Sequence, residues 1–219
     1  MEKQNVAAPN AEERVSNYEI AKKNTQKIFL EYDQNEMIEK WKLTSDDDFI
    51  YVEMLGRAYR INRADGDVQG SDNEFTDYYE ADFNETLTIY DLLCYAKKDA
   101  HILGDFVPMQ SLSAVKNATS YAGEGFFHKE EMELDHREKA LADACEKLGG
   151  VQQGKGDVAY RIPVFKDLSV LIQFWSSDEE FPASLNIYCD KNTTSYMHFE
   201  TIWYLVSHVM QRIEKYMGI

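Results

Sequence analysis

The chain has little of the residues that interrupt regular structure, with 4 prolines and 11 glycines among 219 residues. This scarcity argues against a disordered or fibrous chain. No stretch approaches the roughly 20 apolar residues that a membrane-spanning helix requires. The N-terminus, Met1 to Asn5, is polar and lacks the apolar run of a signal peptide. We therefore expect a soluble protein of the cytoplasm.

Cysteine is also scarce. Cys94, Cys145 and Cys189 are odd in number and far apart. No two of them have the short spacing of a zinc ribbon, an iron–sulfur loop or a redox dithiol. Two lie in predicted helices and the third ends a predicted strand, so we expect three buried free thiols. Free thiols fit the reducing environment of the cytoplasm.

The chain also has few positively charged residues relative to negatively charged ones. The 23 Lys and Arg residues face 39 Asp and Glu residues, which gives a formal net charge of −16. A surface this acidic repels phosphate backbones and anionic lipid headgroups. The composition therefore predicts that the protein binds neither nucleic acid nor a membrane surface. A basic partner, a cation or a plain solubility role for the charge remain open.

The chain does hold enough apolar residues for a packed core, since 44% are hydrophobic and 13% aromatic. Neither an internal repeat nor a clear linker divides it, so we expect a flexible tail over residues 1–9 and a single domain over residues 10–219. Asn10 is typical of a helix cap, and an apolar stripe over residues 15–32 predicts an N-terminal helix. A second short helical piece is predicted over residues 35–41 as a continuation of the first.

Strands are predicted in both halves of the chain. Residues 49–54 and 59–61 alternate in polarity, and Asp65-Gly66 after them is a strong hairpin signal. Three further strands are predicted over 158–164, 168–175 and 184–189. The almost unbroken apolar run of residues 168–175 indicates a central strand covered on both faces. Further helices are predicted over 89–98, with Thr88 as a cap, over 132–148, and over 196–216.

These elements together predict an α+β fold, with helices at both termini packed on a mixed or antiparallel sheet. Between Ala64 and Ala96 there is no Lys or Arg, and acids accumulate. We therefore expect a long acidic surface loop over residues 65–85. Asp65, Asp67 and Asp72 match the ligand pattern of a calcium loop only in part.

The candidate site lies between residues 160 and 204. An acidic loop, followed by Phe181 and Pro182, joins two predicted strands, and further polar residues follow the second strand and begin the final helix. The candidate ligand-binding residues are Asp178, Glu179, Glu180, Asp190, His198 and Glu200. If they converge, their carboxylates suit a divalent cation such as magnesium, calcium or manganese, and a histidine tilts the choice toward manganese, iron or zinc.

The direction in which the acids of this loop point is also predicted. We expect at least two of its three acids to point inward, held by backbone amides or by Arg161, because Phe181 and Pro182 should anchor the loop. A buried carboxylate must be paired or hydrogen-bonded. The alternative is an ordinary acidic turn. His198 and Glu200 diverge by about 200° around a helix, which weakens a metal site built on that pair alone.

Several runs resemble an uncharacterised bacterial family, the domain-of-unknown-function family three-seven-eight-six, found mostly in anaerobes. The most specific is the Asp-Glu-Glu-Phe-Pro loop with its flanking Phe174-Trp175 and Ala183-Ser184-Leu185. Weaker similarities are Gly56-Arg57-x-Tyr59-Arg60-Ile61, Gly104-x-Phe106-Val107 and Leu148-Gly149-Gly150. Some relatives carry an added iron–sulfur cysteine cluster, which is missing from this sequence. The resemblance implies one domain and a focal loop, and no reaction.

Three classes of function therefore remain open. The first is binding of a small molecule, a divalent cation or a protein partner near the loop of residues 178–182. The second is a metal-dependent hydrolase or lyase that uses the same carboxylates. The third is an interaction module for an anaerobic redox or cofactor-maturation enzyme, with residues 65–85 as its contact. The sequence assigns no catalytic residue, no cofactor and no oligomeric state.

Overall fold

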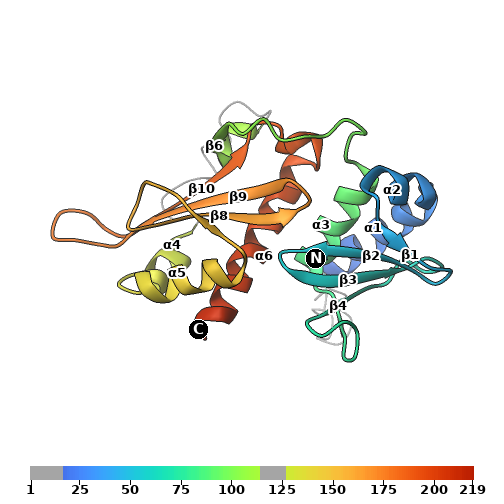
Figure 1. Cartoon of the computed structure of the whole chain (residues 1–219), viewed down its shortest axis with the longest axis horizontal. Helices are drawn as coiled ribbons and strands as arrows, with labels where there is room; N and C mark the ends of the chain where they lie inside the picture. Colours follow the sequence, from blue (N-terminus) through green and yellow to red (C-terminus); the bar gives the residue numbers. More distant parts are fainter. Residues whose placement is uncertain (1–16, 114–126) are drawn as a thin grey trace, which may run out of the picture.

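The computed structural model describes residues 17–113 and 127–219. In this part of the chain it has an α+β fold with six α-helices, helices at both ends and two antiparallel sheets of five strands each, where the sequence predicted one (Figure 1). The helices are α1 (Asn17–Glu31), α2 (Gln34–Trp41), α3 (Phe83–Cys94), α4 (His128–Leu134), α5 (Glu138–Lys147) and α6 (Phe199–Met217). The predicted cap Asn10 and the predicted tail lie outside the described residues.

The first sheet has the strand order β1-β2-β3-β4-β5. Its strands are β1 (Thr44–Ser45), β2 (Phe49–Met54), β3 (Arg57–Asn62), β4 (Val68–Ser71) and β5 (Tyr79–Glu80). Leu55 and Gly56 form the two-residue turn between β2 and β3, both with a positive φ, as tight hairpins require. The predicted Asp65-Gly66 turn is confirmed between β3 and β4, where Gly66 has a φ of 83°.

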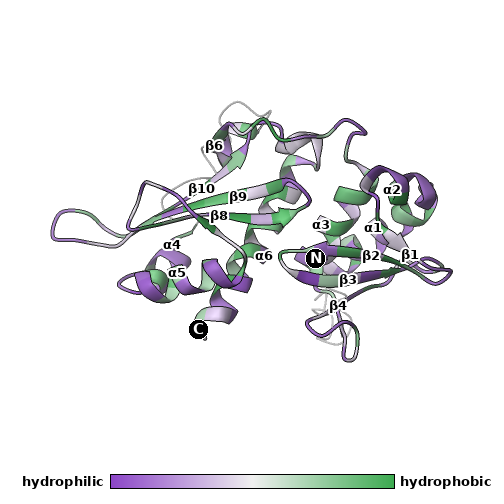
Figure 2. Ribbon diagram, in the orientation of Figure 1, coloured by the Kyte–Doolittle hydropathy of each residue, from purple (hydrophilic) through white to green (hydrophobic). Residues whose placement is uncertain are grey.

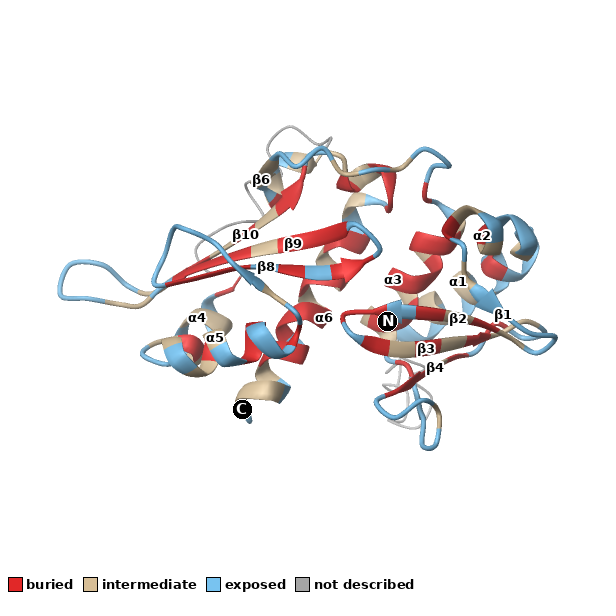
Figure 3. Ribbon diagram, in the orientation of Figure 1, coloured by how far each residue is buried: buried red, intermediate tan, exposed pale blue. Residues whose placement is uncertain are grey.

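The second sheet has the order β6-β10-β9-β8-β7. Its strands are β6 (Phe106–Pro108), β7 (Val151–Gln152), β8 (Val158–Phe165), β9 (Leu168–Trp175) and β10 (Ser184–Asp190). The apolar strand β9 is central, as predicted, and buried on both faces along most of its length (Figures 2 and 3). Leu171 is its one half-buried residue before the exposed end at Trp175.

Helix α6 lies between the two sheets and packs against α3 on one side and α5 on the other (Figure 1). One continuous apolar core runs through both sheets and these helices. A backbone hydrogen bond of 2.8 Å from the Leu55 amide to the Val164 carbonyl also joins the first hairpin to β8. Because α6 contributes side chains to the core beside each of the two sheets, some of its residues lie against the first sheet.

Two predicted helices differ from the structure in their bounds. The predicted helix over 132–148 is broken between α4 and α5, where His136 has a φ of 56° that a helix does not allow. Helix α3 begins six residues before the predicted start, because the side chain of Asp82 accepts a hydrogen bond from the Glu85 amide and that of Glu85 accepts one from the Asp82 amide. This reciprocal capping satisfies two free amides at the helix start. The predicted loop over 65–85 also contains β4 and β5.

All three cysteines are free thiols, as predicted. Cys145 and Cys189 are buried, whereas Cys94 is half-buried. Burial raises the pKa of the Cys145 thiol and of the Cys189 thiol to about 12, so both stay protonated at neutral pH. None of the helices within residues 17–113 and 127–219 combines the length and the apolar character that crossing a bilayer demands.

Candidate functional site

The acidic loop between β9 and β10 lies in solvent. Asp178, Glu179 and Glu180 are all exposed, and so is Phe181, at 66% of its full surface. The expectation that at least two of these acids point inward, held by backbone amides or by Arg161, is therefore wrong. The physical reason is that Asp178 closes the turn on itself: its carboxylate accepts hydrogen bonds of 2.8 Å from the amides of Glu180 and Phe181. This geometry leaves Glu179 and Glu180 at an exposed tip.

The other three candidate residues lie elsewhere. Asp190 is fully buried and accepts hydrogen bonds from the amides of Leu103 and Gly104, so it fixes that segment beside β10. His198 precedes α6, and its Nδ1 lies 2.7 Å from a carboxylate oxygen of Asp91. Glu200 is exposed in the first turn of α6.

The six candidate residues do not form one site. The loop between β9 and β10 projects from the left end of the molecule in Figure 1, away from α6. Among the described residues, no group of three or more His, Cys, Asp or Glu side chains could hold a metal ion. A binding role for any of the six stays a prediction.

A different set of polar side chains meets where the first sheet faces α3 and α6. These side chains are linked by hydrogen bonds or ion pairs, and five of the eight are buried, three of them charged. We call them the polar cluster: Arg57, Tyr59, Asp72, Tyr79, Glu85, His208, Arg212 and Lys215.

Glu85 is the centre of the polar cluster. Its Oε1 accepts hydrogen bonds from the hydroxyls of Tyr59 at 2.7 Å and Tyr79 at 2.6 Å, and from Arg57 Nη1 at 3.1 Å. Burial alone raises the pKa of Glu85, but the hydrogen bond from Tyr79, the nearby His208 and the hydrogen bond from Tyr59 together outweigh it and lower the pKa. Glu85 is therefore a buried carboxylate that stays ionised at neutral pH.

Gly70 on β4 gives Tyr79 the room to reach Glu85. A Cβ at this position would overlap the Tyr79 ring and hydroxyl, at distances that real side chains do not show. The close approach of the tyrosine therefore requires glycine here. Arg57 then lies over the same ring, with its Cζ 5.1 Å from the ring centroid.

Asp72, in the loop after β4, joins the cations of the cluster. Its carboxylate accepts from Arg57 Nε at 2.7 Å and from Lys215 Nζ at 3.0 Å, and it lies 3.6 Å from Arg212 Nη1. The hydrogen bond from Arg57 is the main cause that lowers the pKa of Asp72 to about 2. Asp72 and Lys215 are both more than half exposed, so they form the rim of the cluster.

Arg212 and His208 have unused hydrogen-bonding atoms. Arg212 is 3% exposed and donates through Nη2 to the Tyr216 hydroxyl at 2.9 Å. Among the described residues, its Nε and Nη1 have no hydrogen-bond acceptor, and His208 Nδ1 has no hydrogen-bond partner. Burial lowers the pKa of His208 to about 4, with the cations Arg212 and Arg57 lowering it further and Glu85 opposing them.

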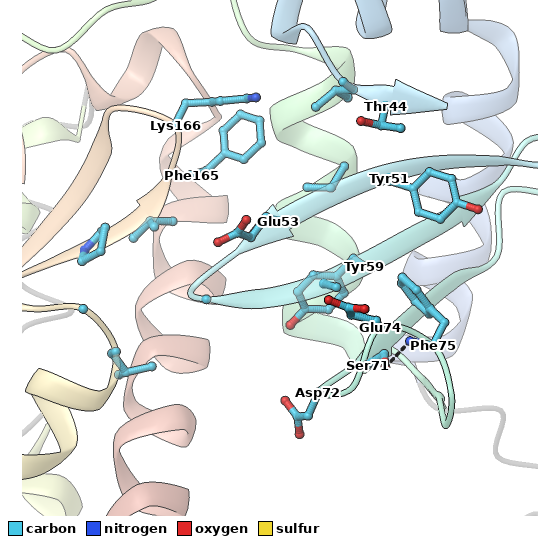
Figure 4. A pocket seen from close by; sticks show the side chains of 18 of the residues that line it. Thr44, Tyr51, Glu53, Tyr59, Ser71, Asp72, Glu74, Phe75, Phe165 and Lys166 are labelled. Atoms are coloured by element: carbon cyan, nitrogen blue, oxygen red, sulfur yellow. Dashed lines mark hydrogen bonds between the residues drawn. The ribbon is translucent and has the colours of Figure 1, made fainter. Parts of the chain in front are cut away.

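Two hollows meet at this cluster. A cleft of about 420 Å³ has among its lining residues Arg57, Tyr79, Glu80, Asp82, His208, Gln211 and Arg212. A groove of about 1200 Å³ separates the first sheet from β8 and the ends of α5 and α6. Figure 4 shows Phe165 and Lys166 across this groove from Glu53. Asp72 and Lys215 line both hollows.

Sequence reasoning missed the polar cluster, although signals for it exist. His208 and Arg212 lie four residues apart, among the buried apolar residues of α6, and buried polar side chains are the informative exceptions in such a stripe. In the sequence Glu85 falls within the predicted acidic loop, and Arg57 and Tyr59 belong to one of the weaker motifs that resemble the family.

Comparison with curated proteins and with solved structures gives no match. A family model, described as Domain of unknown function (DUF3786), matches residues 33–212. This match covers seven of the eight residues of the polar cluster, all but Lys215, and it includes both sheets. The chain belongs to the DUF3786 family.

Proposed function

We propose that this protein binds a small organic acid in the cleft, through one anionic group held by Arg212. The observation that carries the proposal is the state of that side chain. Arg212 is 3% exposed, and two nitrogens of its guanidinium have no hydrogen-bond acceptor among the described residues. A buried polar group without a partner costs about 1–3 kcal/mol, and more if it is charged. A carboxylate from a ligand would supply the missing acceptors.

The charges around the cleft favour a single carboxylate over a polyanion. Each acid of the lining already has a partner: Asp72 and Glu85 have Arg57, Glu80 has Lys22, and Asp82 has the Glu85 amide. Arg57 is likewise fully engaged. One incompletely paired guanidinium matches one negative charge, and four nearby acids repel a ligand with several.

Access to Arg212 depends on the rim. The two nitrogens that lack a hydrogen-bond acceptor, Nε and Nη1, are buried, so a ligand reaches them only when neighbouring side chains move. Lys215 and Asp72 are the natural candidates, because their side chains are 59% and 54% exposed and such side chains change rotamer readily. Lys215 would then also contribute its charge to the bound anion.

The binding function near residues 178–182, the hydrolase or lyase and the interaction module are less well supported. The acidic loop is an exposed turn without an inward-pointing acid. As to location, we propose a cytoplasmic protein, which its free thiols fit. The cleft has what these alternatives lack, namely a buried charge that is incompletely paired.

The proposal is tested by titrating the protein with sodium propionate at constant ionic strength and following backbone amide signals by NMR. We expect saturable shifts at cleft residues, a weaker response to inorganic phosphate, and an apparent Kd about tenfold higher for Arg212→Gln. Arg161→Gln is the matched control, because it removes one exposed arginine from β8 and should bind as the wild type does.

The exposed residue Lys215 gives a second variant that does not depend on a buried substitution. Lys215→Gln should fold normally and bind propionate about threefold more weakly. Unsaturable shifts spread over the surface, or equal affinity in all four proteins, would contradict the proposal.

A further inference from the structure

We infer that the ligand carries a hydrogen-bond donor beside its carboxylate, a hydroxyl or an N–H group, which His208 Nδ1 accepts. The ligand class is then a 2-hydroxy or 2-amino acid, or a similar acid with a neighbouring donor. The inference rests on the proposed function and adds the second recognition element of the same cleft.

The direction of the hydrogen bonds fixes the proton on His208. The Glu85 carboxylate only accepts, so the Tyr59 hydroxyl must give its proton to Oε1, 2.7 Å away. The Tyr59 oxygen can then only accept from His208 Nε2, which lies 3.2 Å away. His208 is neutral at pH 7, because burial lowers its pKa to about 4. Its single proton is therefore on Nε2, and Nδ1 presents a lone pair.

This lone pair is buried and has no donor. His208 is 2% exposed, and no described residue offers a hydrogen bond to Nδ1. The charged groups that face the ring are Glu85, Arg212 and Arg57. The exposed side chain of Gln211 also faces the ring, where its hydrogen-bonding interaction opposes the lowering of the pKa, and a ligand in the cleft would have to displace it. Arg57 is held by Asp72, Tyr79 and Glu85, so it cannot turn to serve as the donor.

The unpaired acceptor and the unpaired donors lie on one helix face. His208 and Arg212 are four residues apart on α6, which places them one above the other, and both line the cleft. A ligand that reaches the Arg212 nitrogens with a carboxylate therefore brings its 2-substituent near the histidine. A site with an unused acceptor prefers the ligand that supplies a donor over the analogue that lacks one.

The test compares lactate with propionate, which differ by one hydroxyl. We expect lactate to bind about tenfold more tightly to the wild type. His208→Gln keeps a polar group at the position of Nε2 and loses the acceptor at Nδ1, so it should bind both acids equally. His208→Asn keeps an acceptor at the position of Nδ1 and should retain the preference for lactate.

A second readout reports the proton positions directly and does not depend on an affinity. The ¹⁵N signals of the His208 imidazole, identified by their loss in His208→Gln, should show a protonated Nε2 and an unprotonated Nδ1, and Nδ1 should shift on addition of lactate. A proton on Nδ1 would overturn the inference whatever binds. Equal affinity for the two acids that still depends on Arg212 would overturn the inference and leave the proposed function standing. Binding of neither acid would overturn both.

Discussion

Arg57 and Glu85 form an ion pair in which both partners are buried: Nη1 lies 3.1 Å from Oε1, and the side chains are 7% and 3% exposed. Two charges are removed from water at a cost of several kcal/mol each, and the geometry must offset that cost. It does so through the two tyrosine hydroxyls and the Asp82 amide, which occupy the remaining positions of the carboxylate. The pair fixes the first sheet against the start of α3.

Breaking this pair should destabilise the protein strongly. Glu85→Gln removes the negative charge that pairs with Arg57 and leaves one acceptor oxygen in place of two, so an N–H group of the new amide faces either the donors at Oε1 or the Asp82 amide. We expect a loss of about 3 kcal/mol in the free energy of unfolding. Urea denaturation measures it. The control is Glu80→Gln, whose ion pair with Lys22 has a 75% exposed carboxylate and should change stability by less than about 0.5 kcal/mol. Equal effects of the two variants would refute a buried pair.

Stability should fall as the pH falls from 7 to 5, because of His208. The pKa of this histidine is lowered to about 4 in the folded protein, whereas it is about 6.5 in the unfolded chain. Below pH 6.5 the unfolded state binds a proton that the folded state does not, so acid favours unfolding. The part of the folding stability that depends on a neutral His208 is fully present above about pH 6.5 and is lost progressively as the pH falls toward 4.

For one such group the loss between pH 7 and pH 5 is about 2 kcal/mol. Urea melts at several pH values should show this slope in the wild type and in His128→Gln, which removes an exposed histidine. The slope should flatten in His208→Gln. A wild-type slope that survives in His208→Gln would assign the pH dependence to other groups.

The sheet order predicts a contrast between two neighbours on β9. Ile172 is 3% exposed at the centre of the second sheet, so Ile172→Ala should cost about 2–5 kcal/mol through lost burial and the cavity left behind. The sequence alone predicts the same cost for Leu171→Ala, but Leu171 is half-buried and should cost clearly less. Denaturant melts of both variants decide whether β9 is buried as described.

The acidic loop gives a prediction about its own hydrogen bonds. Asp178→Ala removes the acceptor for two backbone amides and should lower the melting temperature. Glu179→Gln and Glu180→Gln change exposed side chains and should leave it unchanged. A lower melting temperature in either glutamine variant would restore the idea of an inward-pointing acid.

The sequence predicts those parts of the fold that depend on local pattern. The apolar run of β9, the Asp65-Gly66 turn and the stripe of α6 each carry their own signal within a few residues. The sequence does not reveal the start of α3, because the capping residues Asp82 and Glu85 lie within a longer run of acidic residues. The break at His136 has no signal in the periodicity, since the flanking residues continue a helical pattern.

The polar cluster could not be predicted because it depends on contacts between distant segments. Tyr59 and His208 are 149 residues apart in the chain, and Arg57 and Glu85 are 28 apart. Pattern and propensity report on the near neighbours of a residue, and only the packing of α6 against the first sheet brings these side chains together. The acidic loop is conspicuous in the sequence for the opposite reason, because its three acids are adjacent in the chain.

The central claim is that Arg212 is an incompletely paired cation that receives the carboxylate of a ligand. The most direct measurement is the ¹H–¹⁵N spectrum of the arginine Nε–H groups, with the Arg212 signal assigned by its loss in Arg212→Gln. We expect this signal to shift saturably as lactate is added, while that of Arg161 stays in place. An Arg212 signal that does not move at saturating lactate, or one that moves no more than the signal of Arg161, would contradict it.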